Sequence, residues 1–281
     1  GFLVLRELLD NRGPADALEQ VTFVFVPVFS VDAHERFGRW NRPNQNGPEE
    51  MGWRVTADNL NLNRDYTKAE APEMQAMLRL LNEWDPILYA DLHATDGAQF
   101  EHDISIQVEP RFTGDAGLQP LGAKLLADIN ERLAAQGALP VDFYPSLRDE
   151  NDPSSGFAYG AYPPRFSTGY RALHNRFAVL VETHSWKDYP TRVRLTRNAM
   201  MAMIELAMRD GRTWLKTAAE ADAHAQRMAG DTVTLKYKGG DAHTTIDFHG
   251  YAYVREPSDI SGGTALRYGP TTPQIWRVPL Y

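Results

Sequence analysis

The chain has 281 residues, of which 43% are hydrophobic and 23% are charged, an ordinary composition for a globular protein. Its formal net charge of −8 argues against a nucleic-acid partner, because phosphate backbones bind clustered basic side chains. Cysteine is absent, so disulfides and thiolate metal sites are excluded, and a bound metal would need His, Asp or Glu ligands. The longest apolar run, Val21 to Val31, is about half the length that spans a bilayer.

The first expected element is a helix over Phe2–Asp10, which a turn-forming Asn-Arg-Gly-Pro sequence ends. Val21–Val28 is a β-branched and aromatic run, apolar on both faces, and predicts a buried central strand. Residues 32–66 are polar and have no helical or strand period, which predicts a long loop of the kind that is usually functional. A helix begins at Pro72, and Pro86–Leu92 is predicted as a second buried strand.

The second half of the chain continues this alternation. Leucine and isoleucine at helical spacing predict a helix from Leu118 to Leu133, and residues 140–171 are again irregular. Phe177–Val181 reads as a short buried strand, and a long helix is expected over Arg192–Met208. From Asp231 onward, alternating residues and Gly-rich turns predict a β-rich region, seen only in part. The pattern indicates an α/β sheet with helices on its faces.

Four places in this pattern carry polar side chains suited to chemistry. Arg54 and the pair Asn63-Arg64 lie in the first long loop, and guanidinium groups match carboxylates in bidentate geometry. His93 and Glu182 each follow a predicted buried strand, and the carboxyl ends of such strands are where ligands gather. The alternatives are solvated loop arginines, a structural histidine and a strand-end glutamate that reaches solvent. No G-x-S-x-G, H-E-x-x-H, Walker-type loop or G-x-G-x-x-G is present.

The order of these features resembles a known family. Asn61-Leu62-Asn63-Arg64-Asp65, then Asp91-Leu92-His93, then Glu182 after a late apolar strand are similar to the carboxypeptidase A-type zinc peptidases, and to their bacterial members most. The resemblance covers about residues 1–210. It implies a mixed, mostly parallel sheet with helices on both faces and a catalytic domain over residues 1–215 that is truncated at its N-terminus. The C-terminal pattern adds an incomplete β-rich region over residues 216–281. The family usually has Asp where this chain has Asn61.

The resemblance also implies roles for individual residues. His93 matches the third zinc ligand and Glu182 the catalytic glutamate, while Arg54 matches the arginine that polarises the scissile carbonyl. Asn63 and Arg64 match the pair that grips the terminal carboxylate of the substrate.

The family also has a mobile tyrosine. Tyr159, Tyr162 and Tyr170 all lie within its range, and the sequence does not choose between them. Tyr162 is taken into the predicted site as a substrate-binding residue.

The family's His-x-x-Glu pair, which supplies the other two zinc ligands, is absent from this chain. We expect that pair just upstream of Gly1, with the alternative of a metal-free relative. One histidine cannot hold a catalytic zinc ion, so we predict that these 281 residues alone bind zinc poorly and are inactive.

The predicted function is that of a zinc-dependent metallocarboxypeptidase acting on peptide or protein C-termini. The alternatives are a zinc-dependent deacylase of N-acyl amino acids with the same fold and a non-catalytic module that binds a carboxylate or glycan. The family habit favours an exported protein. The sequence makes no prediction about oligomeric state or the preferred substrate side chain.

Overall fold

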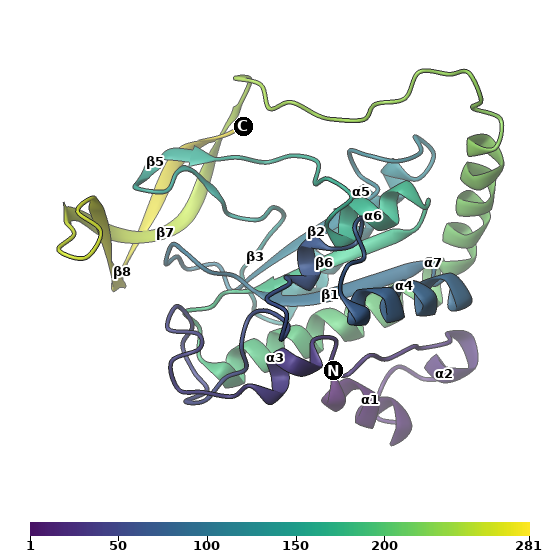
Figure 1. The fold of residues 1–281 in the computed structure, drawn as a ribbon, viewed down its shortest axis with the longest axis horizontal. Coiled ribbons are helices and arrows are strands. Elements are labelled where there is room, and N and C mark those ends of the chain that lie inside the picture. Colours follow the sequence, from purple (N-terminus) through teal and green to yellow (C-terminus); the bar gives the residue numbers. More distant parts are fainter.

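A four-stranded sheet lies at the centre of the computed structural model, which describes residues 1–281 (Figure 1). Its strands run in the order β1 (Leu88–Ala94), β6 (Phe177–Thr183), β2 (Ile104–Glu109) and β3 (Pro140–Val141). The β1–β6 and β2–β3 pairs are parallel, whereas β2 runs antiparallel to β6. The predicted mixed, mostly parallel sheet is confirmed.

Helices cover both faces of this sheet. The largest hydrophobic core joins α1 (Phe2–Leu9), α5 (Gln119–Ala135) and α7 (Tyr189–Ala225) to the apolar side of β2 and β6. On the opposite face, α4 (Pro72–Trp84) packs through a smaller core that includes a tyrosine of β1, and α6 (Ser167–Leu173) packs against β6 and β2. The remaining helices are short, namely α2 (Ala17–Gln20), α3 (Val31–Glu35) and the 3-10 turn η1 (Leu62–Arg64).

Strand β2 divides its side chains strictly between the two faces. Ile104, Ile106 and Val108 enter the main core, whereas Ser105, Gln107 and Glu109 point to the other side and are nevertheless buried. Successive side chains of a strand alternate between faces, so the Ile-Ser-Ile-Gln-Val-Glu sequence gives one apolar and one polar face. That polar face is shared with β6 and β1, and the candidate site lies on it.

Several helix predictions are confirmed in position, and the last helix is longer than expected. It was expected over Arg192–Met208, but α7 runs from Tyr189 to Ala225. The Asp188 side chain accepts a hydrogen bond from the Thr191 N–H and caps its first turn. Trp214 is buried near its far end and extends the packing against the core. None of the helices is both long and apolar enough to cross a membrane.

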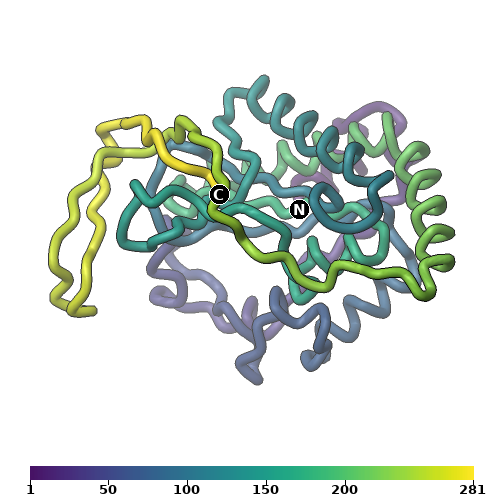
Figure 2. The backbone as a smooth tube through the Cα atoms, turned by 90° about the horizontal axis from the view of Figure 1, so that it is seen from above, coloured from purple at the N-terminus to yellow at the C-terminus, as the bar shows by residue number.

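The predicted β-rich region at the C-terminus forms a long hairpin, β7 (Thr244–Pro257) and β8 (Thr264–Leu280), which projects at one end of the molecule (Figure 2). It joins β4 (Leu147–Asp149) and β5 (Asp152–Phe157) in a second sheet of order β4-β5-β8-β7. Its hydrophobic core includes Phe100 from the first half of the chain. The division at residue 215 stays a prediction, and a boundary there would fall inside α7.

The predicted central strand over Val21–Val28 is wrong. The segment has no strand pairing, and the side chains of Val24 and Val26 are 38% and 39% exposed. It lines an apolar cavity of about 430 Å³ together with β1, α4 and α7 residues. A run that is apolar on both faces is stable as a central strand only with a paired strand on each side and covering layers on both faces. Val21–Val28 has no such partner, because β1, the strand at the edge of the sheet, pairs only with β6. For the same reason β1 is an edge strand and Leu92 is 37% exposed, although it too was expected to be buried.

Candidate active site

The site is built on one row of residues across the central sheet. His93 on β1 and Glu182 on β6 are register partners, and Ser105 on β2 is the partner of Glu182 on its other side. Side chains of paired residues point to the same face of a sheet, so the imidazole and the carboxylate are neighbours. The Ser105 hydroxyl donates a hydrogen bond of 2.7 Å to the Phe143 carbonyl, which ties the row to the following loop. The structure therefore brings the predicted metal ligand and the predicted base together.

His93 is held by a carboxylate one row back on the same strand. Its Nε2 lies 2.8 Å from Oδ1 of Asp91, which is two residues earlier and so points to the same face. Burial lowers the pKa of the His93 imidazole, but the ion pair with Asp91 and the nearby Glu182 outweigh it and raise that pKa to about 9. Nε2 is the ring nitrogen in the ion pair with Asp91, although it makes no well-aligned hydrogen bond there, and Nδ1 is the ring nitrogen left for a ligand.

Glu182 is a buried carboxyl group, with 6% of the residue exposed, and its Oε2 has no hydrogen-bond partner. Burial raises its pKa to about 7, and the charges of Asp91 and Asp96 also raise that pKa. His93 and Arg54 act in the opposite direction but do not restore the ordinary value. A general base works best when its pKa is near the operating pH, and Glu182 meets that condition.

Two arginines without ion-pair partners lie near His93 and Glu182. The charge of Arg54 acts on both His93 and Glu182, and Arg64 is also close enough to sense Glu182. Neither guanidinium takes part in an ion pair. The Arg64 guanidinium lies 4.3 Å from the centre of the Phe166 ring, and burial together with neighbouring Arg54 lowers its pKa. Cations kept near a buried carboxyl without a carboxylate partner are suited to bind an anion.

The loop that carries both arginines is fixed by backbone contacts. The Trp53 N–H donates to the Ala33 carbonyl at 2.7 Å, and a Cβ at Gly52 would lie only 2.6 Å from that same oxygen. Asn61 accepts a hydrogen bond from the Asn63 N–H at 3.2 Å and caps η1. The Asn61 side chain thus stabilises the turn that carries Asn63 and Arg64. The resembled family has Asp at this position.

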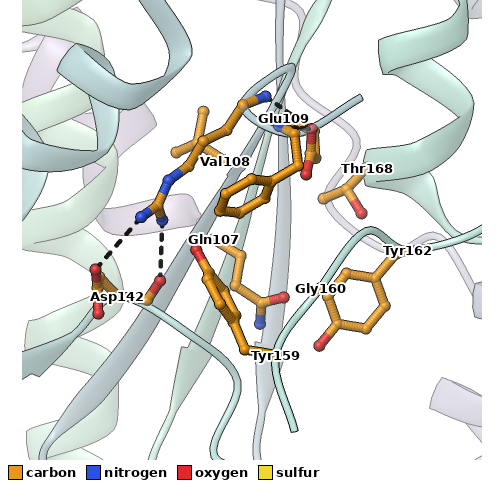
Figure 3. A pocket seen from close by; sticks show the side chains of 10 residues that line it. Gln107, Val108, Glu109, Asp142, Tyr159, Gly160, Tyr162 and Thr168 are labelled. Atoms are coloured by element: carbon orange, nitrogen blue, oxygen red, sulfur yellow. Dashed lines mark hydrogen bonds and ion pairs between the residues drawn. The ribbon is translucent and has the colours of Figure 1, made fainter. Parts of the chain in front are cut away.

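The structure separates the three candidate tyrosines. Tyr162 lies near Glu182, and burial together with that carboxyl raises the Tyr162 pKa to about 12. Tyr159 lines a pocket with Gln107, and Tyr162 lies on the other side of that pocket (Figure 3). Tyr170 packs on Tyr66 with ring centres 5.6 Å apart. Only Tyr162 shares surroundings with the predicted base.

Three residues of this site received no role from the sequence alone. Asp91 is the partner of His93, and its place two residues earlier on a strand was the available signal. Asp96 accepts a hydrogen bond from the Tyr144 hydroxyl at 3.3 Å. The charge of Asp96 raises the pKa of Glu182, and the charge of Glu182 raises the pKa of Tyr144. No local pattern connects these two, because 48 residues separate them in the chain.

The donor set for zinc is incomplete on this chain. His93 fits the role of a ligand, since a ligating histidine usually has its other ring nitrogen held by a carboxylate, as Asp91 does here. However, no group of three or more His, Cys, Asp or Glu side chains that could hold a metal ion is present. A catalytic zinc has three protein ligands, so further ligands would have to come from polypeptide outside these 281 residues.

This leads to a direct prediction about the 281-residue chain. After incubation with zinc and exhaustive dialysis, it should retain well below one equivalent of the metal, because one histidine does not make a chelating site. Metal analysis by mass spectrometry, with a zinc-free sample as reference, measures this. Stoichiometric zinc that is lost on His93→Ala would show that the chain completes the donor set by itself.

His184 follows the base by two residues but has a packing role. It is 1% exposed, its ring stacks on Phe100 with centres 3.9 Å apart, and its Nε2 accepts a hydrogen bond from the Phe100 N–H. Nδ1 lies 3.3 Å from the Thr95 hydroxyl. Burial is the main cause that lowers the His184 pKa to about 3, so the imidazole is neutral in the folded protein.

This neutral histidine should make stability depend on pH. Because the pKa of His184 is lower in the folded than in the unfolded chain, its stabilising effect is complete above about pH 6.5 and is lost as pH falls toward 3. Between pH 7 and 4.5, the free energy of unfolding should fall by roughly 2 kcal/mol more in the wild type than in His184→Gln. Urea titrations at both pH values test this, with the exposed His34→Gln as the control. Equal pH dependence in wild type and His184→Gln would refute it.

Comparison with known proteins finds solved structures of limited likeness. No family model matches the chain, and no curated protein matches it. A solved structure from Burkholderia cenocepacia is 14% identical with a TM-score of 0.48, covering 74% of this chain and 53% of that one. One from Pseudomonas aeruginosa, in complex with (2-guanidinoethylmercapto)succinic acid, is 13% identical with a TM-score of 0.48, covering 73% and 52%. Both are metallo-carboxypeptidases.

The chain thus spans about half the length of the solved structures that it matches. At these identities the likeness concerns the fold. The chemistry of this chain has to follow from its own side chains.

Proposed function

We propose that this chain carries the base and the substrate-binding residues of a zinc-dependent metallocarboxypeptidase, which hydrolyses the peptide bond next to a free C-terminal carboxylate. The observation that supports it most is the pairing of His93 with Glu182 on adjacent strands, with two unpaired arginines beside them. A buried base of raised pKa and a histidine held by Asp91 are the parts needed for hydrolysis. The arginines supply the recognition of an anionic substrate.

In this proposal Glu182 and Arg54 have separate roles in the hydrolysis. Glu182 accepts a proton from the attacking water and returns it to the leaving amine. Arg54, whose charge is felt by both Glu182 and His93, stabilises the oxyanion that develops on the scissile carbonyl. Zinc, when bound by His93 and ligands from outside these residues, would supply a Lewis acid that lowers the pKa of water.

The second arginine sets the position of the bond that is cleaved. Arg64 and Asn63 project from η1, and we propose that they bind the terminal carboxylate of the substrate. The Arg64 guanidinium packs on the Phe166 ring, and Tyr162 contacts that ring edge-on with centres 5.6 Å apart. Fixing the carboxylate there would place the last peptide bond over the row of His93 and Glu182.

Removal of the Arg64 charge tests this assignment in the zinc-loaded protein with all its ligands. Arg64→Gln should raise the KM for a peptide with a free C-terminus by about 10- to 100-fold, because a bond to a charged partner contributes about 1.5–3 kcal/mol. The matched control is Arg79→Gln, an exposed arginine on α4 without an ion pair. Steady-state kinetics on a peptide and its C-terminal amide measure the effect.

The outcome has three readings. Wild-type protein that cleaves only the free-acid peptide, and loses that preference on Arg64→Gln, supports the proposal. Cleavage of the amide at an equal rate would contradict the role of Arg64. A panel of N-acyl amino acids run beside the peptides distinguishes a deacylase, which would turn over the acyl compounds faster.

A further inference from the structure

A second row of the sheet's polar face lies next to the candidate site. Asp91, Leu180 and Gln107 are register partners across β1, β6 and β2, one row behind His93, Glu182 and Ser105. Gln107 is therefore a diagonal neighbour of Glu182 on the adjoining strand, and diagonal neighbours on one face lie within reach of a long side chain. Anything bound over Glu182 passes close to Gln107.

The Gln107 side chain is buried in a pocket and has no partner there. The residue is 6% exposed, and neither its Nε2 nor its Oε1 makes a hydrogen bond. The hydroxyl of Tyr159 in the same pocket is also buried and unpaired. Figure 3 shows the Gln107 amide between Tyr159 and Tyr162. Buried polar atoms without partners are rare because each costs about 1–3 kcal/mol, so three in one pocket indicate a place for a ligand's polar group.

Each charged side chain that lines this pocket already has its own polar partners. Oε2 of Glu109 accepts hydrogen bonds from three backbone N–H groups and from the Thr113 hydroxyl. Arg111 lies 3.7 Å from the Asp142 carboxylate and donates to the Asp142 carbonyl, both drawn in Figure 3. No free cation or anion is left to neutralise a charged ligand group, and burial of an unpaired charge is prohibitive. The pocket is suited to a group that is polar and uncharged.

We propose that Gln107 and Tyr159 form a specificity subsite that binds the side-chain carboxamide of a C-terminal glutamine or asparagine in the substrate. The amide of Gln107 offers one donor and one acceptor, which is the complement of another carboxamide. This inference rests on the proposed function, because the bond to be cleaved must lie over Glu182. The free space between these residues is about 10 Å³, which one water would fill. Gly160 and Tyr162 form its wall in a segment without regular secondary structure, and the proposal requires this wall to move outward when a carboxamide binds.

Matched substrates measure the subsite in the zinc-loaded protein. Peptides that end in Gln, Glu, Lys or Leu and are otherwise identical should show the highest kcat/KM for Gln, by at least about 10-fold over Leu. Gln107→Leu should abolish this ratio, and Tyr159→Phe should reduce it. Gln136→Leu, at an exposed position after α5, is the matched control. A preference for Glu or Lys, or a ratio unchanged in Gln107→Leu, would overturn the proposal.

A binding experiment separates this inference from the proposed hydrolysis. Chemical-shift titration of the 281-residue chain with N-acetylglutamine, N-acetylglutamate and N-acetylleucine needs neither zinc nor turnover. Tighter binding of N-acetylglutamine, lost in Gln107→Leu and kept in Gln136→Leu, supports the subsite even if no peptide is cleaved. Peptide cleavage without any selectivity in either experiment refutes the subsite and leaves the hydrolase in place.

Discussion

Replacing Glu182 by glutamine should lower the kcat/KM of the zinc-loaded protein for a peptide by about 10²–10⁴-fold, the usual contribution of a positioned general base. The amide keeps the size of the side chain in its buried place on β6 but cannot accept the proton of the attacking water. Zinc content should not change, because Glu182 is not assigned as a ligand. Initial rates and metal analysis on the same preparation test both statements, and near-normal turnover would remove Glu182 from the role of base.

The same variant has a second expected effect, on stability. Burial raises the pKa of Glu182 in the folded chain to about 7, above its value in an unfolded chain. Its contribution to stability is therefore complete below about pH 4.3 and is lost as pH rises through 7. Glu182→Gln in the zinc-free chain should be more stable than the wild type at pH 8 by roughly 1–3 kcal/mol, and the gain should vanish at pH 4. Glu131→Gln, exposed on α5, serves as the control.

Replacing His93 by alanine should abolish turnover by a different route. The variant removes the only residue of this chain that we propose as a zinc ligand, and loss even of a group that supports a ligand costs about 10- to 100-fold in metal affinity. We expect His93→Ala to lose its zinc on dialysis against a weak chelator while Glu182→Gln retains it. His224→Ala, an exposed histidine paired with Asp115, is the matched control. Full zinc content in His93→Ala would exclude the histidine from the metal site.

The placement of His93 and Glu182 on the sheet was predictable, because each comes at the end of an apolar run and is the second-last residue of its strand. A carboxylate or imidazole directly after such a run stands at the sheet's carboxyl edge, and the motif order linked His93 to Glu182. Strand β2 was missed, since its buried polar residues interrupt every apolar stretch and its alternation spans only Ile104–Glu109. The prediction for Val21–Val28 was wrong for the opposite reason. Its composition fits a central strand, but no strand of the chain pairs with it.

Contacts between distant parts of the chain were beyond local patterns. The hydrogen bond from Tyr144 to Asp96 depends on how the loop after β3 folds over β1. The same holds for the Gln107 pocket, which takes residues from β2, from the segment after β5 and from α6. Periodicity locates a strand and its faces, but it cannot tell which loop will cover them.

The parallel pairing of β1 with β6 has a consequence for how the protein loses activity. These strands are joined through a long connection that contains β2, α5 and the second sheet's first strands. Such a pair forms only when most of the intervening chain has collapsed around it. His93 and Glu182 should consequently part only when the whole domain melts, so thermal inactivation and the cooperative loss of near-UV ellipticity should share a single midpoint.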